Sequence, residues 1–418
     1  MERIVIAGGR PLSGKVRSGG AKYSALPILG ATLLTESPCV IREVPNLTDV
    51  KVMCRILEDL GAKVEVNGDA IRVEAAALTS LTVPEHLMRE MRSSIIVMGA
   101  ILTRFGTVKV SQPGGCDIGS RPIDLHIKGL RELGAEISEK HGYITATCKR
   151  LRGASIHLEF PSVGATQNLM MAATLAEGTT VITNAAKEPE IVDLQNFINS
   201  LGANIKGAGT DTIRIEGVEK LHGTDYTIIP DRIAAGTYLI AGTITGGQVT
   251  VENVIPEHLE SLLAKLREMG VQVETTGDSV SVCVNQPLKA IDSLRTLPYP
   301  GFPTDLQAPM MALLCIANGT SVVTETVFES RFKHVNELRR MGADIKVNER
   351  TAIIKGVPAL SSANVAATDL RAGAALVLAG LAADGITVVS DVHHIYRGYD
   401  KLEENLKALN ARIERIGI

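Results

Sequence analysis

The 418-residue chain repeats itself six times along its length. A short motif, Leu or Met followed by Gly or Asn, a small residue, any residue and Ile or Val, returns at intervals of 68 to 73 residues. Its copies begin at Leu60, Leu133, Leu201, Met269, Met341 and Leu409. Each copy ends an amphipathic helix, such as those predicted over 50–61 and 259–270, whose apolar residues fall at i, i+3, i+4 and i+7. The Gly, replaced by Asn410 in the last copy, fits the left-handed position that closes a helix, and a strand follows.

A second helix recurs within most units, and it is apolar on nearly every side. Clear copies run into β-branched strands at 172–185, 240–254, 313–327 and 378–392, with weaker copies at 28–41 and 97–110. A helix without a polar face must be buried on most sides, so we expect helices inside and strands outside. Because a single core rarely exceeds about 250–300 residues, two globular α/β domains of three units each are favoured over one six-unit ring.

The composition argues against several classes of partner. Aromatic residues make up 3% of the chain, Trp is absent and no Lys/Arg run occurs, so no nucleic-acid partner is expected. No stretch of about 18 apolar residues exists, so no membrane partner is expected. The start, MERIVIAGG, has the pattern of a strand and not of a signal peptide. The six scattered cysteines lack zinc spacing and are expected to be reduced thiols, which together indicates a cytoplasmic protein.

The segment 111–126, SQPGGCDIGSRPIDLH, is a candidate for chemistry. Cys116 lies in a glycine-rich, turn-prone stretch between Pro113 and Pro122, which keep it out of a helix. Arg121 can stabilise a nearby anion, either a thiolate or a substrate phosphate. Two interpretations are open at this stage: a reactive or proton-donating cysteine, and a structural loop cysteine.

Lys22 and Arg92 precede two of the apolar helices. Lys22 follows Gly19-Gly20 before a helix predicted over 25–34, and glycines at a helix N-terminus suit a phosphate. The alternative for Lys22 is a glycine-rich turn with a solvated lysine. Arg92, at the start of a buried helix, must meet an anion or reach solvent.

Three arginines of the second half, Arg331, Arg371 and Arg397, lie near helix starts, and we predict that they share one phase of the repeat. Together with the basic residues of the first half they predict a ring of positive charge facing an inter-domain cleft, which implies a small polyanionic ligand. Asp305 is either the N-cap of the helix that follows it or a general base that faces the cleft.

Seven segments of the chain together resemble the UDP-N-acetylglucosamine enolpyruvyl transferases, or 1-carboxyvinyltransferases. The resemblance covers the whole chain and is carried by PGGCDIGSRPIDLH (113–126), FPSVGAT (160–166), AAKEPEIVDLQNF (185–197), GFPTDLQA (301–308), TETVFESRFKHVNEL (324–338), ATDLRAGAALVLAG (367–380) and HHIYRGYDKLEENL (393–406). The related 5-enolpyruvylshikimate-3-phosphate synthases share the fold and the Lys/Arg ring but lack the cysteine-containing motif.

The resemblance implies two inside-out α/β barrel domains, each of three repeated units with buried helices and outer sheets. Residues 22–230 would form the domain that carries the Cys116 loop, and 1–21 with 231–418 the other, with the active site in the cleft between them and 111–126 closing over it. The reaction implied is an addition–elimination in which the 3′-hydroxyl of UDP-N-acetylglucosamine attacks C2 of phosphoenolpyruvate, C3 is protonated and phosphate leaves. It serves peptidoglycan synthesis and needs no metal or other cofactor. The implied partners are these two small molecules, and the implied state is a monomer or weak homo-oligomer.

The resemblance also assigns roles to individual residues. Cys116 matches the proton donor to C3, which fosfomycin alkylates, and Asp305 matches the base for the 3′-hydroxyl; Lys22 and Arg397 complete the catalytic set. The phosphoenolpyruvate site matches Lys22, Tyr23, Arg121 and Arg397 around the reacting centre and phosphate, with Arg331 and Arg371 near the carboxylate. The UDP-N-acetylglucosamine site matches Arg92, Arg121, Pro122, Ile123, Asp124, Leu125, Ser162, Val163, Gly164, Asp305 and Val327.

One position departs from the family pattern. Tyr23 stands where the family usually has Asn, so a side-chain amide that would contact the reacting centre is replaced by a larger phenol. We expect the substrate class to be retained with an altered rate or affinity. Two alternatives follow: transfer to another hydroxyl acceptor such as shikimate 3-phosphate, and a diverged nucleotide-sugar-binding paralogue with low activity.

Overall fold

The computed structural model describes residues 2–114, 118–119 and 122–417. The chain divides into two compact units: unit 1 is Met1–Gly19, Asp117–Ser120 and Pro230–Ile418, and unit 2 is Gly20–Cys116 and Arg121–Ile229. The domain expected over 22–230 corresponds to unit 2, which also includes residues 20–21. Residue 230 and the segment 117–120, expected in that domain, belong to unit 1 instead.

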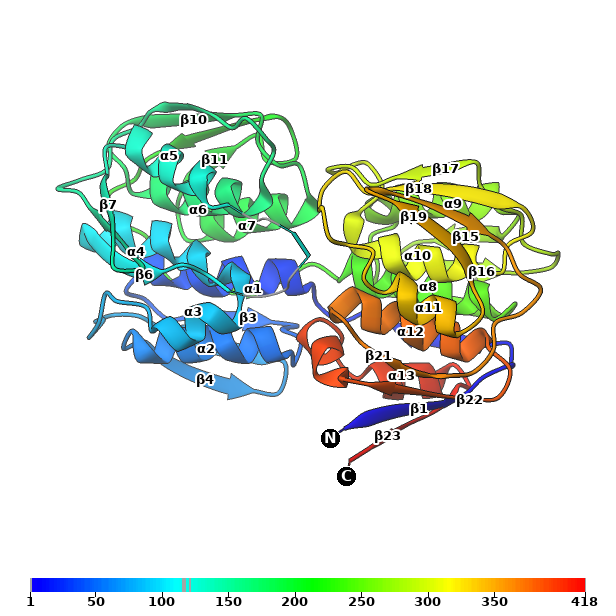
Figure 1. Cartoon of the computed structure of the whole chain (residues 1–418). Helices are drawn as coiled ribbons and strands as arrows, with labels where there is room; N and C mark the ends of the chain where they lie inside the picture. Colours follow the sequence, from blue (N-terminus) through cyan, green and yellow to red (C-terminus); the bar gives the residue numbers. More distant parts are fainter. Residues whose placement is uncertain (1, 115–117, 120–121, 418) are drawn as a thin grey trace. The chain divides into compact units, whose positions relative to one another are not determined.

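Unit 2 consists of three sheets around a set of buried helices (Figure 1). Its buried helices are α1 (Lys22–Ala31), α4 (Val97–Phe105) and α6 (Val163–Thr174), and its amphipathic helices are α2 (Thr48–Asp59), α5 (Asp124–Glu132) and α7 (Pro189–Ser200). The shorter helices are η1 (Thr32–Leu34), α3 (Glu85–Glu90) and η2 (Arg92–Ile96). In spatial order the sheets are β13 (Asp225–Thr227), β3 (Cys39–Arg42), β5 (Ala70–Glu74), β4 (Lys63–Asn67); β6 (Thr107–Ser111), β8 (Tyr143–Thr147), β7 (Glu136–Lys140); and β11 (Asn204–Lys206), β12 (Thr212–Glu216), β10 (Thr179–Thr183), β9 (Ser155–His157).

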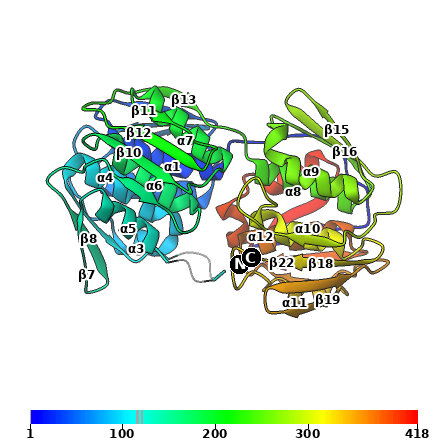
Figure 2. The ribbon, with the colours of Figure 1, turned by 90° about the horizontal axis from the view of Figure 1, so that it is seen from above.

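Unit 1 repeats this architecture, with its buried helices surrounded by strands (Figure 2). The buried helices are α8 (Arg232–Ile244), α10 (Gln307–Leu314) and α12 (Leu370–Ala382), and the others are η3 (Pro256–Leu259), α9 (Glu260–Glu268), η4 (Thr304–Leu306), α11 (Val335–Arg340), η5 (Val392–Arg397) and α13 (Leu402–Ala408). The sheets are β21 (Asn364–Ala366), β22 (Ile386–Ser390), β1 (Arg3–Ala7), β23 (Arg412–Ile416); β15 (Gln272–Thr276), β16 (Ser279–Cys283), β14 (Gln248–Glu252), β2 (Ser13–Arg17); and β17 (Ser293–Arg295), β18 (Thr320–Thr324), β20 (Thr351–Lys355), β19 (Asp344–Asn348).

All six sheets share one pairing pattern. In each, the strand that follows a buried helix pairs antiparallel with a strand that pairs antiparallel with a third, as β18 does with β20 and β20 with β19. Five of the sheets add a short parallel strand at the other edge, as β17 does beside β18. In the sheet of β6 that edge is a single parallel bridge between Thr82 and Lys109. The same unit of structure therefore occurs six times, which confirms the repeat and the inside-out α/β prediction.

The residue pattern explains why the helices lie inside. In α12, LRAGAALVLAGLA, nearly every residue is buried, and small residues let neighbours approach closely: a Cβ on Gly373 would overlap the side chain of Ile395. The strands alternate instead, with Ile4 and Ile6 fully buried and Arg3 exposed. Each unit has its own hydrophobic core. The six predicted helix ends also hold, since each motif's Gly, or Asn410 with φ 67°, has a left-handed backbone.

Three smaller observations complete the fold. Helix α1 begins at Lys22, three residues before the predicted Ala25, so Lys22 belongs to the first helical turn. The five cysteines that the structure describes, all except Cys116, are free thiols. Within the described ranges, none of the helices combines the length and the apolarity that a membrane crossing requires.

Candidate active site

Several of the predicted site residues lie at the N-terminal ends of the buried helices. In unit 2, Lys22 is the first residue of α1, Arg92 begins η2, which leads into α4, and Ser162 is the N-cap of α6. In unit 1, Asp305 lies in η4, which leads into α10, and Arg371 is the second residue of α12. Helix N-termini carry partial positive charge and unpaired N–H groups, so the buried ends of these helices favour anions.

Lys22 forms a buried ion pair. Its Nζ lies 2.9 Å from Oδ2 of Asp49, in the first turn of α2, and both side chains are 4% exposed. The solvated-lysine interpretation is therefore wrong. Tyr23 is half-buried beside this pair, with its ring centroid 5.5 Å from the Lys22 ammonium. Asp49 was missed in the sequence because an acid in the first turn of a helix is an ordinary feature of helix starts.

A chain of hydrogen bonds joins three elements of unit 2 near Arg92. The Asn168 amide oxygen accepts from the Gly99 N–H at 2.6 Å, so its NH₂ group faces Nδ1 of His126 at 2.9 Å, and Nδ1 is the acceptor. Burial, and secondarily the charge of Arg92, lowers the pKa of His126 to about 4, so the ring is neutral. Arg92 itself is half-buried and donates from Nη1 to the Pro113 carbonyl at 3.3 Å. In the sequence His126 marks only the end of the segment 111–126 and has no assigned role, and Asn168 carries no signal of its own.

The remaining predicted residues of unit 2 open two helices. Ser162 accepts a hydrogen bond from the Ala165 N–H at 3.3 Å, and Val163 and Gly164 form the first turn of α6. Residues 122–123 lead into α5, and Asp124 and Leu125 are its first two residues. A hollow of about 450 Å³ is lined by Ile123, Asp124, Leu125, Ile127, Lys128, Arg131, Glu139 and Glu159. The predicted residues Cys116 and Arg121 lie outside the described residues.

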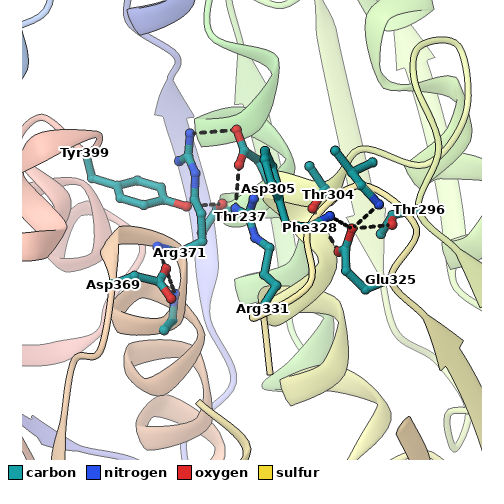
Figure 3. A network of polar contacts seen from close by, with 12 residues as sticks. Thr237, Thr296, Thr304, Asp305, Glu325, Phe328, Arg331, Asp369, Arg371 and Tyr399 are labelled. Atoms are coloured by element: carbon teal, nitrogen blue, oxygen red, sulfur yellow. Dashed lines mark hydrogen bonds and ion pairs between the residues drawn. The ribbon is translucent and has the colours of Figure 1, made fainter. Parts of the chain in front are cut away.

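Asp305 is the centre of a charged cluster in unit 1 (Figure 3). Its carboxylate accepts from Nη2 of Arg331 at 2.6 Å and lies 3.5 Å from Nη2 of Arg371; the two arginine side chains are 4% and 2% exposed. The N-cap interpretation of Asp305 is wrong, because Pro303 is the N-cap of η4 and makes no side-chain cap bond. Two guanidinium groups therefore face the single carboxylate of Asp305.

Arg371 is held from several sides. Its guanidinium lies 5.1 Å from the ring centroid of Tyr399, whose hydroxyl is 2.9 Å from that of Thr237 in α8. Asp369 caps α12 by accepting from the backbone N–H groups of Arg371 and Ala372, at 2.8 and 3.0 Å. The sequence TDLRAG carries a cap signal for Asp369, but its packing beside Arg371 needed the fold.

The predicted common phase of the three arginines is wrong for one of them. Arg331 precedes the amphipathic helix α11 and Arg397 ends η5 before α13, so these two are equivalent in the repeat. Arg371 instead lies inside the buried helix α12. Strands β17 and β18, which precede the buried helix α10 and the amphipathic helix α11, pair in parallel, so the loops that lead to the two kinds of helix leave the sheet at the same end. Val327 is half-buried in the Arg331 loop.

Comparisons with known proteins identify the class. The family model described as EPSP synthase (3-phosphoshikimate 1-carboxyvinyltransferase) matches residues 6–406. The structure of the enolpyruvyl transferase NikO from Streptomyces tendae superposes with a TM-score of 0.88 at 27% sequence identity, covering 99% of this chain and 98% of that one. The EPSP synthase from Acinetobacter baumannii has the same fold, with a TM-score of 0.77 at 19% identity over the full length of both chains. Fold and family model therefore define a carboxyvinyl transferase.

More similar relatives narrow the assignment. The chain is 56% identical over 416 residues, the whole of both chains, to UDP-N-acetylglucosamine 1-carboxyvinyltransferase 2 of Caldanaerobacter subterraneus. It is 56% identical over 421 residues to UDP-N-acetylglucosamine 1-carboxyvinyltransferase 1 of Symbiobacterium thermophilum, covering 99% of this chain and 95% of that one. The chain belongs to the EPSP synthase family and, within it, to the UDP-N-acetylglucosamine 1-carboxyvinyltransferases.

Proposed function

We propose that this protein transfers the enolpyruvyl group of phosphoenolpyruvate to the 3′-hydroxyl of UDP-N-acetylglucosamine, with release of phosphate, in cytoplasmic peptidoglycan synthesis. The observation that carries the proposal is the identity of 51–56% over the full length to relatives of that name. The positive clusters at buried helix ends support it, because both substrates are anions. The roles proposed below draw on side chains of both units.

The basic residues would act on the phosphoenolpyruvate. Lys22, Arg121 and Arg397 would hold the phosphate and stabilise the charge that develops as it leaves. Arg331 and Arg371 would take the substrate carboxylate, a role supported by their two guanidinium groups beside the single carboxylate of Asp305. Guanidinium forks suit carboxylates because they present two parallel N–H donors.

Proton transfers would fall to Asp305 and Cys116. The 3′-hydroxyl proton would pass to the Asp305 carboxylate while the hydroxyl oxygen bonds to C2, and Cys116 would donate the proton to C3. Elimination would then return a proton from C3 to the Cys116 thiolate and restore the C2–C3 double bond, and the departing phosphate would take the proton held by Asp305. Arg92, Arg121, residues 122–125, Ser162–Gly164 and Val327 would bind the uridine-diphosphate sugar, and helix-start N–H groups and the hollow beside residues 123–125 are suited to it.

The test is phosphate release with phosphoenolpyruvate and UDP-N-acetylglucosamine, with and without fosfomycin, beside the Cys116→Ala variant. Release that is abolished by the drug and by the substitution supports the acceptor, the reaction and the cysteine together. Release that survives fosfomycin keeps the reaction but removes Cys116 from the chemistry.

A control with shikimate 3-phosphate as acceptor separates the alternatives. Release only with that acceptor would assign the protein to the other branch of the family. Calorimetric binding of UDP-N-acetylglucosamine, without phosphate release from phosphoenolpyruvate in the presence of either acceptor, would indicate a nucleotide-sugar-binding paralogue, with Tyr23 as the first position to restore to Asn.

A further inference from the structure

Glu325 is a buried carboxylate that follows β18. The residue is 1% exposed. Its Oε1 accepts from the Thr296 hydroxyl at 2.7 Å and from the N–H groups of Val327 and Phe328 at 2.9 and 3.2 Å; its Oε2 accepts from the Thr304 hydroxyl at 2.8 Å (Figure 3). All four of these donors are neutral. A charge buried in this way is costly and needs such a set of hydrogen bonds to be tolerated.

The repeat itself does not require this carboxylate. The equivalent residues after the corresponding strands of the other five units are Glu43, Gln112, Asn184, Asn253 and Asp391. Each of these is half-buried or exposed. Four of them, all except Gln112, adopt a left-handed backbone with φ between 53° and 61°, a conformation that Glu325 does not take. Glu325 therefore has a task specific to its own repeat.

That task is indicated by the two loops that the carboxylate joins. Thr304 directly precedes Asp305, and Val327 and Phe328 lead to Arg331, whose guanidinium pairs with Asp305 at 2.6 Å. Oε2 of Glu325 thus holds the loop that carries Asp305, and Oε1 holds the loop that carries Arg331. We propose that Glu325 is a positioning residue that fixes the Asp305 loop against the 327–331 loop. Its kinetic consequence rests on the roles of Asp305 and Val327 in the proposed function.

The two loops predict separable effects. Loss of the hydrogen bond from Thr304 to Glu325 lets Asp305 move relative to the acceptor hydroxyl. This lowers kcat, since misplacement by about 1 Å costs up to about 100-fold in rate. Loss of the hydrogen bond from the Val327 N–H to Glu325 disturbs the proposed contacts with the sugar nucleotide, which raises KM for UDP-N-acetylglucosamine. A general loss of stability would produce neither split.

Thr304→Val removes only the bond to Oε2, and Thr304→Ser retains the hydroxyl. The matched control is Thr296→Val, which removes the bond to Oε1 and also leaves the Thr326 N–H, 3.0 Å from the Thr296 hydroxyl oxygen, without its acceptor. Thr296→Val should therefore lower the stability of the fold at least as much as Thr304→Val does, while it leaves the contact between Thr304 and Glu325 in place. Steady-state kinetics, thermal unfolding and amide hydrogen exchange at Leu306 are measured for all three variants.

We expect Thr304→Val to lower kcat about tenfold, with KM for UDP-N-acetylglucosamine changed less than about twofold, and to speed exchange at Leu306. Thr304→Ser should restore both. Equal losses of kcat in Thr304→Val and Thr296→Val, or unchanged kcat and unchanged Leu306 exchange in Thr304→Val, would overturn the proposal. If the wild-type protein releases no phosphate, the proposed function fails, and the exchange at Leu306 alone decides whether Glu325 positions this loop.

Discussion

Replacing Asp49 by asparagine removes the charge that faces the buried Lys22 ammonium. The pair is 2.9 Å apart and each side chain is 4% exposed, so solvent screens it little. Removing one partner of such a pair costs about 3–5 kcal/mol, because the remaining charge is left buried. For a unit of roughly 200 residues, each kcal/mol lowers Tm by about 2–4 °C, so about 3 kcal/mol corresponds to a decrease of roughly 6–12 °C.

Differential scanning calorimetry is the assay, because it measures the Tm of the whole chain, in which unit 2 carries the pair. The double variant Lys22→Met/Asp49→Leu removes both charges and should recover most of the lost stability, since a hydrophobic pair of similar volume is often neutral. It should nevertheless release no phosphate, because Lys22 is a proposed ligand of the leaving group. The single variant keeps Lys22 and should retain partial activity.

A Tm decrease below about 2 °C in Asp49→Asn would refute this reasoning, as it would mean that the pair adds almost nothing to stability. A double variant as unstable as the single one would refute it in another way. The instability of Asp49→Asn could then not be attributed to the uncompensated Lys22 charge, because the double variant carries no such charge.

Three further predictions test other parts of the chain. Tyr23→Asn should raise kcat/KM for phosphoenolpyruvate about tenfold by restoring one hydrogen bond to a charged group, and unchanged steady-state constants would show that position 23 is unimportant. Gly99→Ala should lower the stability by about 1–3 kcal/mol in calorimetry, because its Cβ would overlap the backbone of Asn168; a wild-type Tm would contradict the close packing of α4 on α6. His126 has a folded pKa of about 4, below its ordinary value of 6.5, so unit 2 should be fully stabilised above pH 6.5 and lose about 3 kcal/mol as the pH falls toward 4. The His126→Gln variant should show a flatter Tm–pH curve between those values, and an unchanged curve would contradict this assignment.

The repeat architecture was predictable because its signals are local. The glycine that ends each amphipathic helix, such as Gly61 with φ 102°, is fixed by the turn it must make, and an all-apolar helix can only be buried. The sequence therefore carried the number of units, their helix ends and the inside-out layering.

The contacts of the candidate site could be predicted only in part, because they join residues far apart in the chain. Asp305 resembled an N-cap because it sits just before a buried helix, yet its charge is used by Arg331, 26 residues away. The partner of Lys22 lies 27 residues on, in a different helix. Long-range pairing of this kind leaves no periodic mark in the sequence, so only the fold reveals it.

The departures from the repeat are as informative as the repeat. Six equivalent connections follow six equivalent strands, and four of the residues that begin them use a left-handed backbone, as Asn184 and Asn253 do. The side-chain amides of these two then donate to the carbonyls of Leu158 and Ser18, each at 2.7 Å, which caps a neighbouring loop and satisfies the local fold. Glu325 does not adopt the left-handed backbone, and its buried side chain carries the free-energy cost of a buried charge. At one of six equivalent positions, a buried carboxylate thus replaces a left-handed residue of low energetic cost. The free-energy cost of burying that carboxylate must be offset by an interaction that the other five positions lack. The feature that distinguishes this position is the ion pair of Asp305, whose loop Glu325 contacts through Thr304.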